Sequence, residues 1–304
     1  MEHIKVITSI QDSLASYAKD NALKCLVLGV SGGVDSALCA AIARPVCDSL
    51  NIGLTGRSIP IATNKRDEIA RAVTVGKEFC TDFKEVDLGD AFPGLIKTLI
   101  EDDEPGDITH ERKVRRGNLK ARLRMVRLYD LAAKHRGMVI STDNLTECML
   151  GFWTLNGDVG DYALIQRLWK TEVYELSDFM AESLESQHRA SAARALRECI
   201  EAVPTDGLGV SNSDLDQFGA QSYDEVDRIL KTWLCKDQDN FSWDTYLNYH
   251  GRPVDYEEFV KLRESYSEHP VVKRYLASEF KRCLPLFQER WKIEGLDKYP
   301  GEYP

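Results

Sequence analysis

The feature that most constrains this chain is the stretch LVLGVSGGVDS at residues 26–36, where an apolar run enters a glycine-rich turn. A short apolar run that ends at glycines is typical of a buried strand, and the small and apolar residues after it favour a helix. Glycines let the backbone come close to a ligand, and the free N–H groups at a helix start favour a phosphate. Ser31 and Ser36 add hydroxyl donors. The stretch therefore predicts a strand, a phosphate-binding loop and a helix in succession.

Asp35 is the residue of this loop that a phosphate alone does not explain. A carboxylate beside a polyphosphate is repelled unless a divalent cation lies between them, as in phosphate-bound Mg²⁺ sites. The loop therefore points to a complex of Mg²⁺ with a nucleotide. The alternative is a tight strand–helix turn that binds no ligand. Two common phosphate-binding patterns, GxxxxGK[ST] and GxGxxG, are absent from the sequence.

The composition narrows the class of protein. The 304 residues carry 39 Lys and Arg against 49 Asp and Glu, a formal charge of 39 − 49 = −10, which argues against a general nucleic-acid-binding surface. The eight cysteines form no Cys-x-x-Cys pair, so the sequence predicts reduced cytosolic thiols rather than a zinc cluster or a disulfide scaffold. The sequence shows neither a charged-then-apolar leader nor an apolar run long enough to cross a bilayer. We expect a soluble, cytoplasmic protein without membrane or nucleic-acid partners.

Strand and helix patterns alternate along the chain. Apolar runs predict strands at residues 24–30, 51–60, 83–88 and 138–142, and helical spacing predicts helices at 4–17, 37–50, 112–131, 170–184 and 189–200. Asn64 is expected to cap a further helix, and Pro45 to kink or end the helix that contains it. Such alternation implies an α/β fold, a doubly wound parallel sheet with helices on both faces and a ligand at the carboxyl ends of the strands.

Two charged runs follow one another in the middle of the chain. Residues 101–107 are acidic and end in turn residues, which favours a solvated loop. From Arg112 to Arg127 basic residues alternate with apolar ones at helical spacing, and the ordinary interpretation is a helix with a solvated basic face. Arg122 is a candidate functional residue because it lies in the segment GNLKARLRM at 117–125.

Several segments, in the same order along the chain, resemble known enzymes. SGGVDS at 31–36 looks like the signature loop of the ATP pyrophosphatases, which split ATP between its α- and β-phosphates to adenylate a substrate. Segments similar to those of the NAD synthetases, one branch of these enzymes, are GNLKARLRM at 117–125, GFWTLNGD at 151–158, KT at 170–171, PTDGL at 204–208 and YDEVD at 223–227. The polar residues 212–222 lie where that family has a mobile loop and are expected to form a lid.

The resemblance implies ammonia-dependent synthesis of NAD from deamido-NAD. In this reaction the carboxylate of deamido-NAD attacks the α-phosphorus of ATP, pyrophosphate leaves, and ammonia opens the acyl-adenylate to give the amide and AMP. Negative charge builds on the oxygens at phosphorus, so the site needs cations and N–H donors rather than a protein nucleophile. Because only one predicted helix precedes the strand of the loop, we expect no glutaminase domain and the use of free ammonia.

The resemblance also implies roles for individual residues. Asp35 and Lys170 are the implied catalytic groups, and Asp35 and Glu147 the implied Mg²⁺ ligands, although a carboxylate at a helix start can also be a capping residue. Implied contacts are Arg122, Asp161 and His269 for deamido-NAD, and Gly29, Ser31, Gly32, Gly33, Asp35, Ser36, Thr142, Lys170 and Thr205 for ATP. The similar synthetases are homodimers that bind deamido-NAD at the subunit interface, so a homodimer is expected here.

The chain departs from the family pattern at two places. Leu155 stands where ammonia-dependent members often have a lysine, in a loop one residue shorter, and Pro270 replaces the lysine expected after Ser-Glu-His at 267–269. A leucine cannot pair with a carboxylate or a phosphate, so the deamido-NAD pocket must differ there. The alternatives are another ATP pyrophosphatase (GMP synthetase-like or tRNA-thiolating), a non-catalytic nucleotide-binding subunit and a nucleic-acid module on the basic helix. Residues 1–240 are expected to form the synthetase domain, and residues 241–304 a helical extension packed on it.

Overall fold

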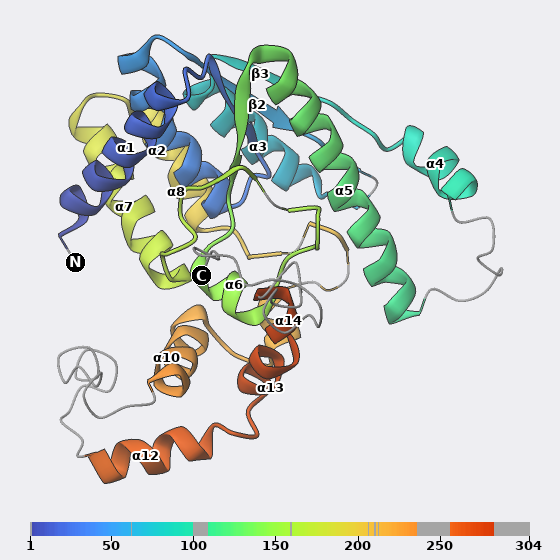
Figure 1. The fold of residues 1–304 in the computed structure, drawn as a ribbon, viewed down its shortest axis with the longest axis vertical. Helices are drawn as coiled ribbons and strands as arrows, with labels where there is room; N and C mark the ends of the chain where they lie inside the picture. The colour runs from blue at the N-terminus through green and yellow to red at the C-terminus, as the bar shows by residue number, and fades with distance from the viewer. Residues whose placement is uncertain are drawn as a thin grey trace, which may run out of the picture.

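A five-stranded parallel sheet, in the order β3-β2-β1-β4-β5, forms the centre of the molecule (Figure 1). The computed structural model describes residues 2–61, 63–99, 109–158, 160–205, 207–209, 211, 213–235 and 256–282. The strands are β1 Cys25–Gly29, β2 Gly53–Ser58, β3 Asp82–Glu85, β4 Gly137–Ser141 and β5 Tyr162–Ala163. The predicted α/β fold with a parallel sheet is confirmed.

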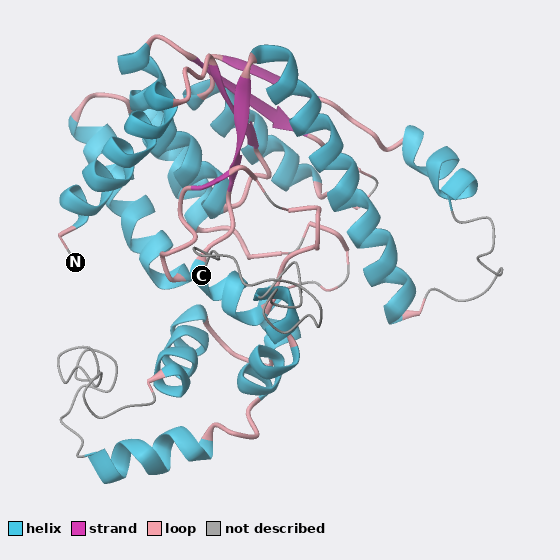
Figure 2. Ribbon diagram, viewed as in Figure 1, coloured by secondary structure: helices cyan, strands magenta, loops and turns pink. Residues whose placement is uncertain are grey.

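Helices cover the sheet on both faces, as Figure 2 shows by colour. α5 packs on β1 and β4 from one side, whereas α2 packs on β1 and β2 from the other side together with α3. The helices are α1 His3–Asp20, α2 Val34–Leu50, α3 Arg66–Phe79, α4 Ala91–Leu99, α5 His110–His135, α6 Leu145–Leu150, α7 Lys170–Ser186, α8 Ala190–Ile200, α9 Asp214–Phe218, α10 Tyr223–Leu234, α12 Tyr256–Ser265, α13 Pro270–Ala277 and α14 Glu279–Arg282.

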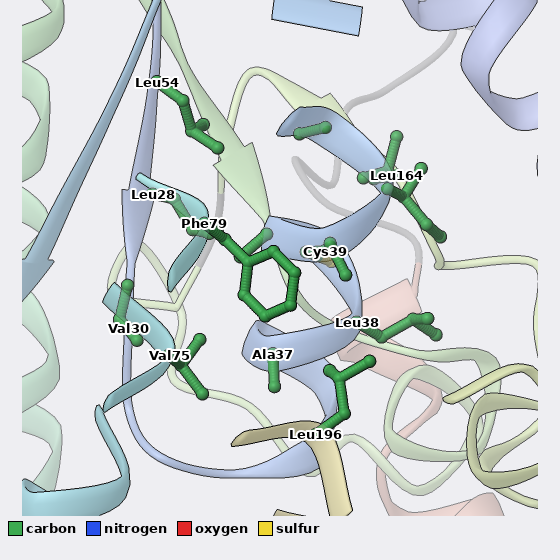
Figure 3. Packing of buried hydrophobic residues seen from close by; sticks show 14 of the residues in the cluster. Leu28, Val30, Ala37, Leu38, Cys39, Leu54, Val75, Phe79, Leu164 and Leu196 are labelled. Atoms are coloured by element: carbon green, nitrogen blue, oxygen red, sulfur yellow. The ribbon is translucent and has the colours of Figure 1, made fainter. Parts of the chain in front are cut away.

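The alternation of side chains along β1 divides the core into two parts. Leu26 and Leu28 point to the α2 face and belong to the largest buried cluster, whereas Val27 points to α5 and packs with Leu131. Small residues such as Ala37 let α2 lie close to the sheet. Figure 3 shows side chains of the larger cluster, among them Leu28, Val30, Ala37, Leu38, Cys39, Leu54, Val75, Phe79, Leu164 and Leu196.

The order of the strands reverses its direction at β1, the strand that leads into the glycine loop. β1 lies between β2 and β4, so the connection after β1 leads to one side and the connection after β4 to the other. In open parallel sheets such a point leaves a crevice at the carboxyl ends of the strands, where ligands bind. The loop at residues 30–33 and the segment at residues 142–144 both begin at this crevice.

The C-terminal helices form a second hydrophobic cluster below the sheet. Phe218 of α9 and Leu230 of α10 are fully buried there against Val271 and Val272 of α13 and Leu150 of α6. In Figure 1, α13 and α14 lie beside α6. Helical structure is thus confirmed at residues 256–282 by α12, α13 and α14; the rest of 241–304 lies outside the described residues, and the division at residue 240 stays a prediction. Among the described residues, no helix has both the length and the apolar character that crossing a bilayer requires.

Two details at helix boundaries differ from the sequence predictions. α2 does not end at Pro45 but continues to Leu50, and burial of Val46 beyond the proline helps to hold that last turn in place. The N-cap of α3 is Lys65, not Asn64. Asn64 Oδ1 accepts the N–H of Ile61 at 3.0 Å instead and so shapes the loop before the helix.

Three further segments differ from expectation or lie outside the described residues. β5 was not expected, because two residues carry no readable alternation. The segment 212–222, expected as a lid, contains α9, and Phe218 at its end is anchored in the core. The acidic run 101–107 lies outside the described residues.

Candidate active site

The glycine loop that follows β1 has a shape that depends on Gly32. Gly32 has φ +84°, and a Cβ atom there would lie 2.2 Å from the carbonyl oxygen of Glu68 in α3. The two serines hold the loop closed on itself: their hydroxyls are 3.0 Å apart, Ser31 N–H donates to Ser36 Oγ, and Ser36 Oγ donates to the Gly33 carbonyl. α2 begins at Val34 directly after the loop, so its first N–H groups face the crevice.

Lys170 joins the loop to the acidic residues across the crevice. Its ammonium Nζ donates to Asp35 Oδ2 and, at 3.2 Å, to Glu147 Oε1. The Lys170 side chain is 3% exposed, and those of Asp35 and Glu147 are 17% and 14% exposed. Asn144 Nδ2 donates to the other Asp35 oxygen at 2.8 Å. The structure therefore brings together the three residues expected to carry catalysis and metal binding.

The charges in this cluster shift one another's protonation. Burial raises the pKa of Glu147 to about 7; the Lys170 ammonium opposes that shift, and the Asp35 carboxylate adds to it. Burial alone would lower the pKa of Lys170, but the two carboxylates raise it well above its ordinary value. The lysine is therefore charged at any physiological pH. Glu147 can gain or lose a proton near neutrality.

Three helix starts supply these three side chains. Asp35 lies in the first turn of α2, Glu147 in the first turn of α6, and Lys170 is the first residue of α7. The capping interpretation of Glu147 is confirmed, because Oε2 of Glu147 accepts the Asn144 N–H at 3.2 Å while Asn144 Oδ1 accepts the Glu147 N–H. Glu147 thus gives one oxygen to its helix and one to the lysine.

Asp227 of α10 supports the cluster from behind. Its side chain is fully buried, and its carboxylate accepts hydrogen bonds from Thr146 Oγ1 and from the Thr171 N–H at 2.9 Å. Thr146 Oγ1 in turn accepts the Lys170 N–H at 2.9 Å. A single carboxylate therefore ties the start of α6 to the start of α7. Sequence reasoning saw the YDEVD segment only as a helix start and missed this role.

A cavity of about 290 Å³ opens around the loop and the charged cluster. Of the predicted site residues, Gly29, Ser31, Gly32, Gly33, Asp35, Thr142, Glu147, Lys170 and Thr205 line it. Ser36 is buried beneath the loop and is not among the lining residues. Thr205 Oγ1 donates to Glu68 Oε1 at 2.8 Å, so the far wall is tied to α3. Most of the residues assigned to ATP thus surround one space.

Two basic residues of α5 do not lie on a solvated face. Lys120 is 4% exposed, and its ammonium donates to Thr63 Oγ1 at 2.7 Å and to the Leu208 carbonyl at 3.1 Å. Arg124 lines the cavity and donates to the Ile59 carbonyl and to Asn64 Oδ1. Lys120 and Arg124 lie beside Ala121 and one helical turn after it, on the face of α5 that Ala121 buries. This helical spacing is the sequence signal that could have predicted their burial. For these residues the expectation of a solvated basic face is wrong.

The half-buried carboxyl groups Asp143 and Asp158 also line the cavity. Burial first, and then repulsion from Glu147, raises the pKa of Asp143 well above its ordinary value. Burial likewise raises the pKa of Asp158, whose Oδ2 accepts the Thr154 N–H at 2.7 Å. Sequence reasoning assigned no role to either group.

The three residues assigned to deamido-NAD do not line this cavity. Arg122 donates through Nε to the Leu155 carbonyl at 3.2 Å, and Asp161 Oδ2 accepts the Val139 N–H at 2.9 Å. His269 is the N-cap of α13, where its Nδ1 accepts the Val271 N–H at 3.2 Å. Each has a local structural contact within the chain, and none of them meets the lysine–carboxylate cluster.

A model of the NAD synthase family matches residues 6–285 of the chain. The chain belongs to this NAD synthase family. It is 34% identical over 211 residues to the NH(3)-dependent NAD(+) synthetase of Methanoregula boonei, which covers 68% of the chain and 74% of that relative. It is 28% identical over 298 residues to that of Helicobacter pylori, covering 96% of the chain and 99% of the relative.

Two solved structures share the fold of this chain. The NMN synthetase from Francisella tularensis matches with a TM-score of 0.70 and 21% identity over 95% of this chain and 99% of that one. The NH3-dependent NAD synthetase from Campylobacter jejuni matches with a TM-score of 0.61 and 21% identity over 95% and 100% of the two chains.

The carboxylates of this NAD synthase family member suit a hard cation. Among the described residues, no group of three or more His, Cys, Asp or Glu side chains could hold a metal ion. Mg²⁺ does not need one, because it is commonly held by one or two carboxylates with the remaining positions taken by water and substrate phosphates. Asp35 and Glu147 both contact the Lys170 ammonium, so one oxygen of each carboxylate lies close to the same point. This pair fits Mg²⁺ that arrives with a nucleotide.

Proposed function

We propose that this chain is an ammonia-dependent NAD synthetase that converts deamido-NAD, ATP and ammonia to NAD, AMP and pyrophosphate. The observation that carries the proposal is the buried Lys170 between Asp35 and Glu147, beside the glycine loop and within a NAD synthase family fold. A buried cation fixed next to a phosphate-binding loop is what adenylation demands, because negative charge develops on the phosphorus oxygens.

Different residues would act on different parts of ATP in the first step, adenylation of the substrate carboxylate. The loop N–H groups and the first turn of α2 would hold the β- and γ-phosphates, with Thr142 and Thr205 as further ATP contacts. The Lys170 ammonium would stabilise charge on the α-phosphate as the substrate carboxylate attacks and pyrophosphate leaves. Asp35 and Glu147 would hold Mg²⁺, which supplies charge neutralisation for the leaving pyrophosphate. No protein nucleophile is needed.

The second substrate is proposed to bind between two copies of the chain. Arg122, Asp161 and His269 lie away from the cavity of their own chain, and a homodimer formed through α5 is one way to give Arg122 access to a shared site. The seven cysteines among the described residues are free thiols, which supports a reducing, cytoplasmic location.

A second candidate differs only in the size of the substrate. Leu155 lacks the ammonium that the family lysine would offer to an anionic group, and one structural neighbour carries the name NMN synthetase. The carboxylate precursor of NMN, a mononucleotide, would undergo the same adenylation and amidation in the same cavity. The ratio of kcat/KM for the two carboxylate substrates decides between the candidates.

The test is a reaction of the purified protein with Mg-ATP, ammonium and each carboxylate substrate in turn. NAD, AMP and pyrophosphate should appear in equal amounts with deamido-NAD, and Lys170→Met should abolish all three. Formation of ADP in place of AMP, or product formation only with glutamine and no ammonium, would overturn the proposal.

A further inference from the structure

The carboxyl end of α6 has more carbonyl groups than its own turn can satisfy. The helix spans only Leu145–Leu150, and its last carbonyls have no partner inside the helix. The turn at Gly151 satisfies two of them, since Gly151 N–H donates to the Cys148 carbonyl at 3.2 Å and Phe152 N–H to the Glu147 carbonyl at 2.9 Å. The carbonyls of Met149 and Leu150 remain.

Side chains of α13 and α14 satisfy those two carbonyls. Arg274 Nε donates to the Leu150 carbonyl at 3.0 Å, and Arg282 Nη1 donates to the Met149 carbonyl at 2.6 Å. The Arg274 guanidinium also lies over the rings of Phe152 and Phe218, at 5.2 and 5.3 Å. Cations at this end complement the helix dipole. α6, which carries Glu147 in its first turn, is therefore held at its other end by the C-terminal helices.

Lys281 extends the same contact into the segment after α6. Its ammonium donates to the Gly151 carbonyl at 2.7 Å and to the Trp153 carbonyl, and it lies 5.5 Å from the centre of the Trp153 ring. The C-terminal helices come so close to residue 151 that only glycine fits there. A Cβ on Gly151 would lie 2.4 Å from Cβ of Ser278, and Gly151 has φ +57°.

The segment fixed in this way leads directly into the cavity. Residues 151–158 form the loop, and Phe152, Gly157 and Asp158 line the cavity wall. Its other side is tied to α5, since Thr154 Oγ1 donates to Asn118 Oδ1 at 2.9 Å. The loop is thus held between α5 and the C-terminal helices, with the half-buried carboxylate of Asp158 at its end.

We propose that Lys281, together with Arg274 and Arg282, positions the 151–158 loop so that it presents its cavity face to the carboxylate substrate. This inference rests on the proposed function, in which Leu155 of the loop stands where the family lysine would meet an anionic group of the carboxylate substrate. Lys281 touches no substrate itself and is a positioning residue. It gives the C-terminal helices a part in substrate binding that the sequence left unassigned.

The experiment compares Lys281→Met with Lys281→Arg and with the control Lys273→Met. Lys273 lies on the neighbouring helix α13, but it is exposed and pairs only with Glu268 among the described residues, at 2.8 Å. Lys281→Met should raise the KM for deamido-NAD about tenfold while the KM for ATP stays within about twofold, with partial recovery in Lys281→Arg and no change in the control. Equal rises in both KM values, or no change in either, would overturn the inference.

Hydrogen exchange on the ligand-free protein gives a readout that needs no turnover. The amides of Thr154 and Gly157, which are bonded within the loop, should exchange faster in Lys281→Met, while peptides over residues 30–36 should not change. If Lys281→Met does not fold, Lys281→Gln takes its place. Unchanged loop exchange in a folded variant refutes the positioning role, whereas failure of the wild type to make NAD refutes only the proposed function.

Discussion

Asp227 is the residue whose replacement tests how the site is held in place. Its fully buried carboxylate accepts hydrogen bonds from Thr146 Oγ1 and the Thr171 N–H. Thr146 precedes Glu147 in the sequence, and Thr171 follows Lys170. Asp227→Ala removes both acceptors without touching the cavity, since Asp227 is not among its lining residues. Any effect on activity would therefore act through the starts of α6 and α7.

The expected magnitude follows from the two donors that lose their partner. A buried donor left unpaired costs about 1–3 kcal/mol, so Asp227→Ala should lower the free energy of unfolding by about 2–6 kcal/mol. Asp227→Asn keeps one acceptor oxygen but turns an amide NH₂ toward the second donor, and it should cost roughly half as much.

The cost of Asp227→Asn should also depend on pH. Burial raises the pKa of Asp227 in the folded state, although its hydrogen bonds oppose the shift. The folded acid then holds its proton at a pH where the unfolded chain, with a pKa of about 3.9, has lost it. Wild-type stability therefore falls as pH rises through this window, whereas an asparagine does not titrate. The difference in the free energy of unfolding between the wild type and Asp227→Asn should be largest at low pH and should decrease as pH rises.

Urea unfolding followed by far-UV circular dichroism, between pH 4.5 and pH 8, measures these differences. Asp224→Asn on the exposed face of α10 is the control, and it should stay within about 0.5 kcal/mol of the wild type. In parallel, kcat for NAD formation should fall in Asp227→Ala. If that variant unfolds like the wild type and keeps its kcat, Asp227 does not hold the two helix starts together.

The remaining predictions concern the cavity itself. Lys170→Met should abolish turnover and lower the free energy of unfolding by about 3–5 kcal/mol, because it leaves two largely buried carboxylates without their cation, and calorimetry at pH 8 measures that loss. Gly32→Ala should weaken ATP binding at least about tenfold in titration calorimetry, since its Cβ would displace the first turn of α3. Asp35→Asn and Glu147→Gln should each lose activity while the fold remains intact by circular dichroism, and normal turnover in either would remove that residue from the metal site. Arg122→Ala should raise the KM for deamido-NAD more than that for ATP, and equal changes would favour its structural bond to the loop.

The sequence indicated the fold and the centre of the site because both depend on local patterns. The apolar run before the glycine loop and the alternation of strands and helices are readable within short windows, and the carboxylates and Lys170 lie at helix starts where such groups have a physical reason to be. β5 could not be predicted, since two residues show no period. Lys120 was misread because a run of basic residues does not say which of them faces the core.

The supporting residues were hidden for a different reason. Asp227 acts across 56 residues on Thr171, and Lys281 acts across 130 residues on Gly151. No local pattern marks a side chain whose partners are brought to it only by the tertiary fold. Arg122 and His269 are the opposite case. The family resemblance implied that they contact deamido-NAD, whereas the contacts they make within the chain are structural.

The long reach of the contacts around Lys170 also bears on how the protein is made. Lys170 and Asp35 are 135 residues apart, Asn144 and Asp35 109, and each such contact closes a large loop of chain. Closing loops of this size is slow compared with forming local helices. During synthesis the glycine loop emerges before α6, α7 and α10, so a nascent chain carries this loop before the residues of the charged cluster can meet. Catalytic competence should therefore arise as a late folding event, after the ribosome has released α10.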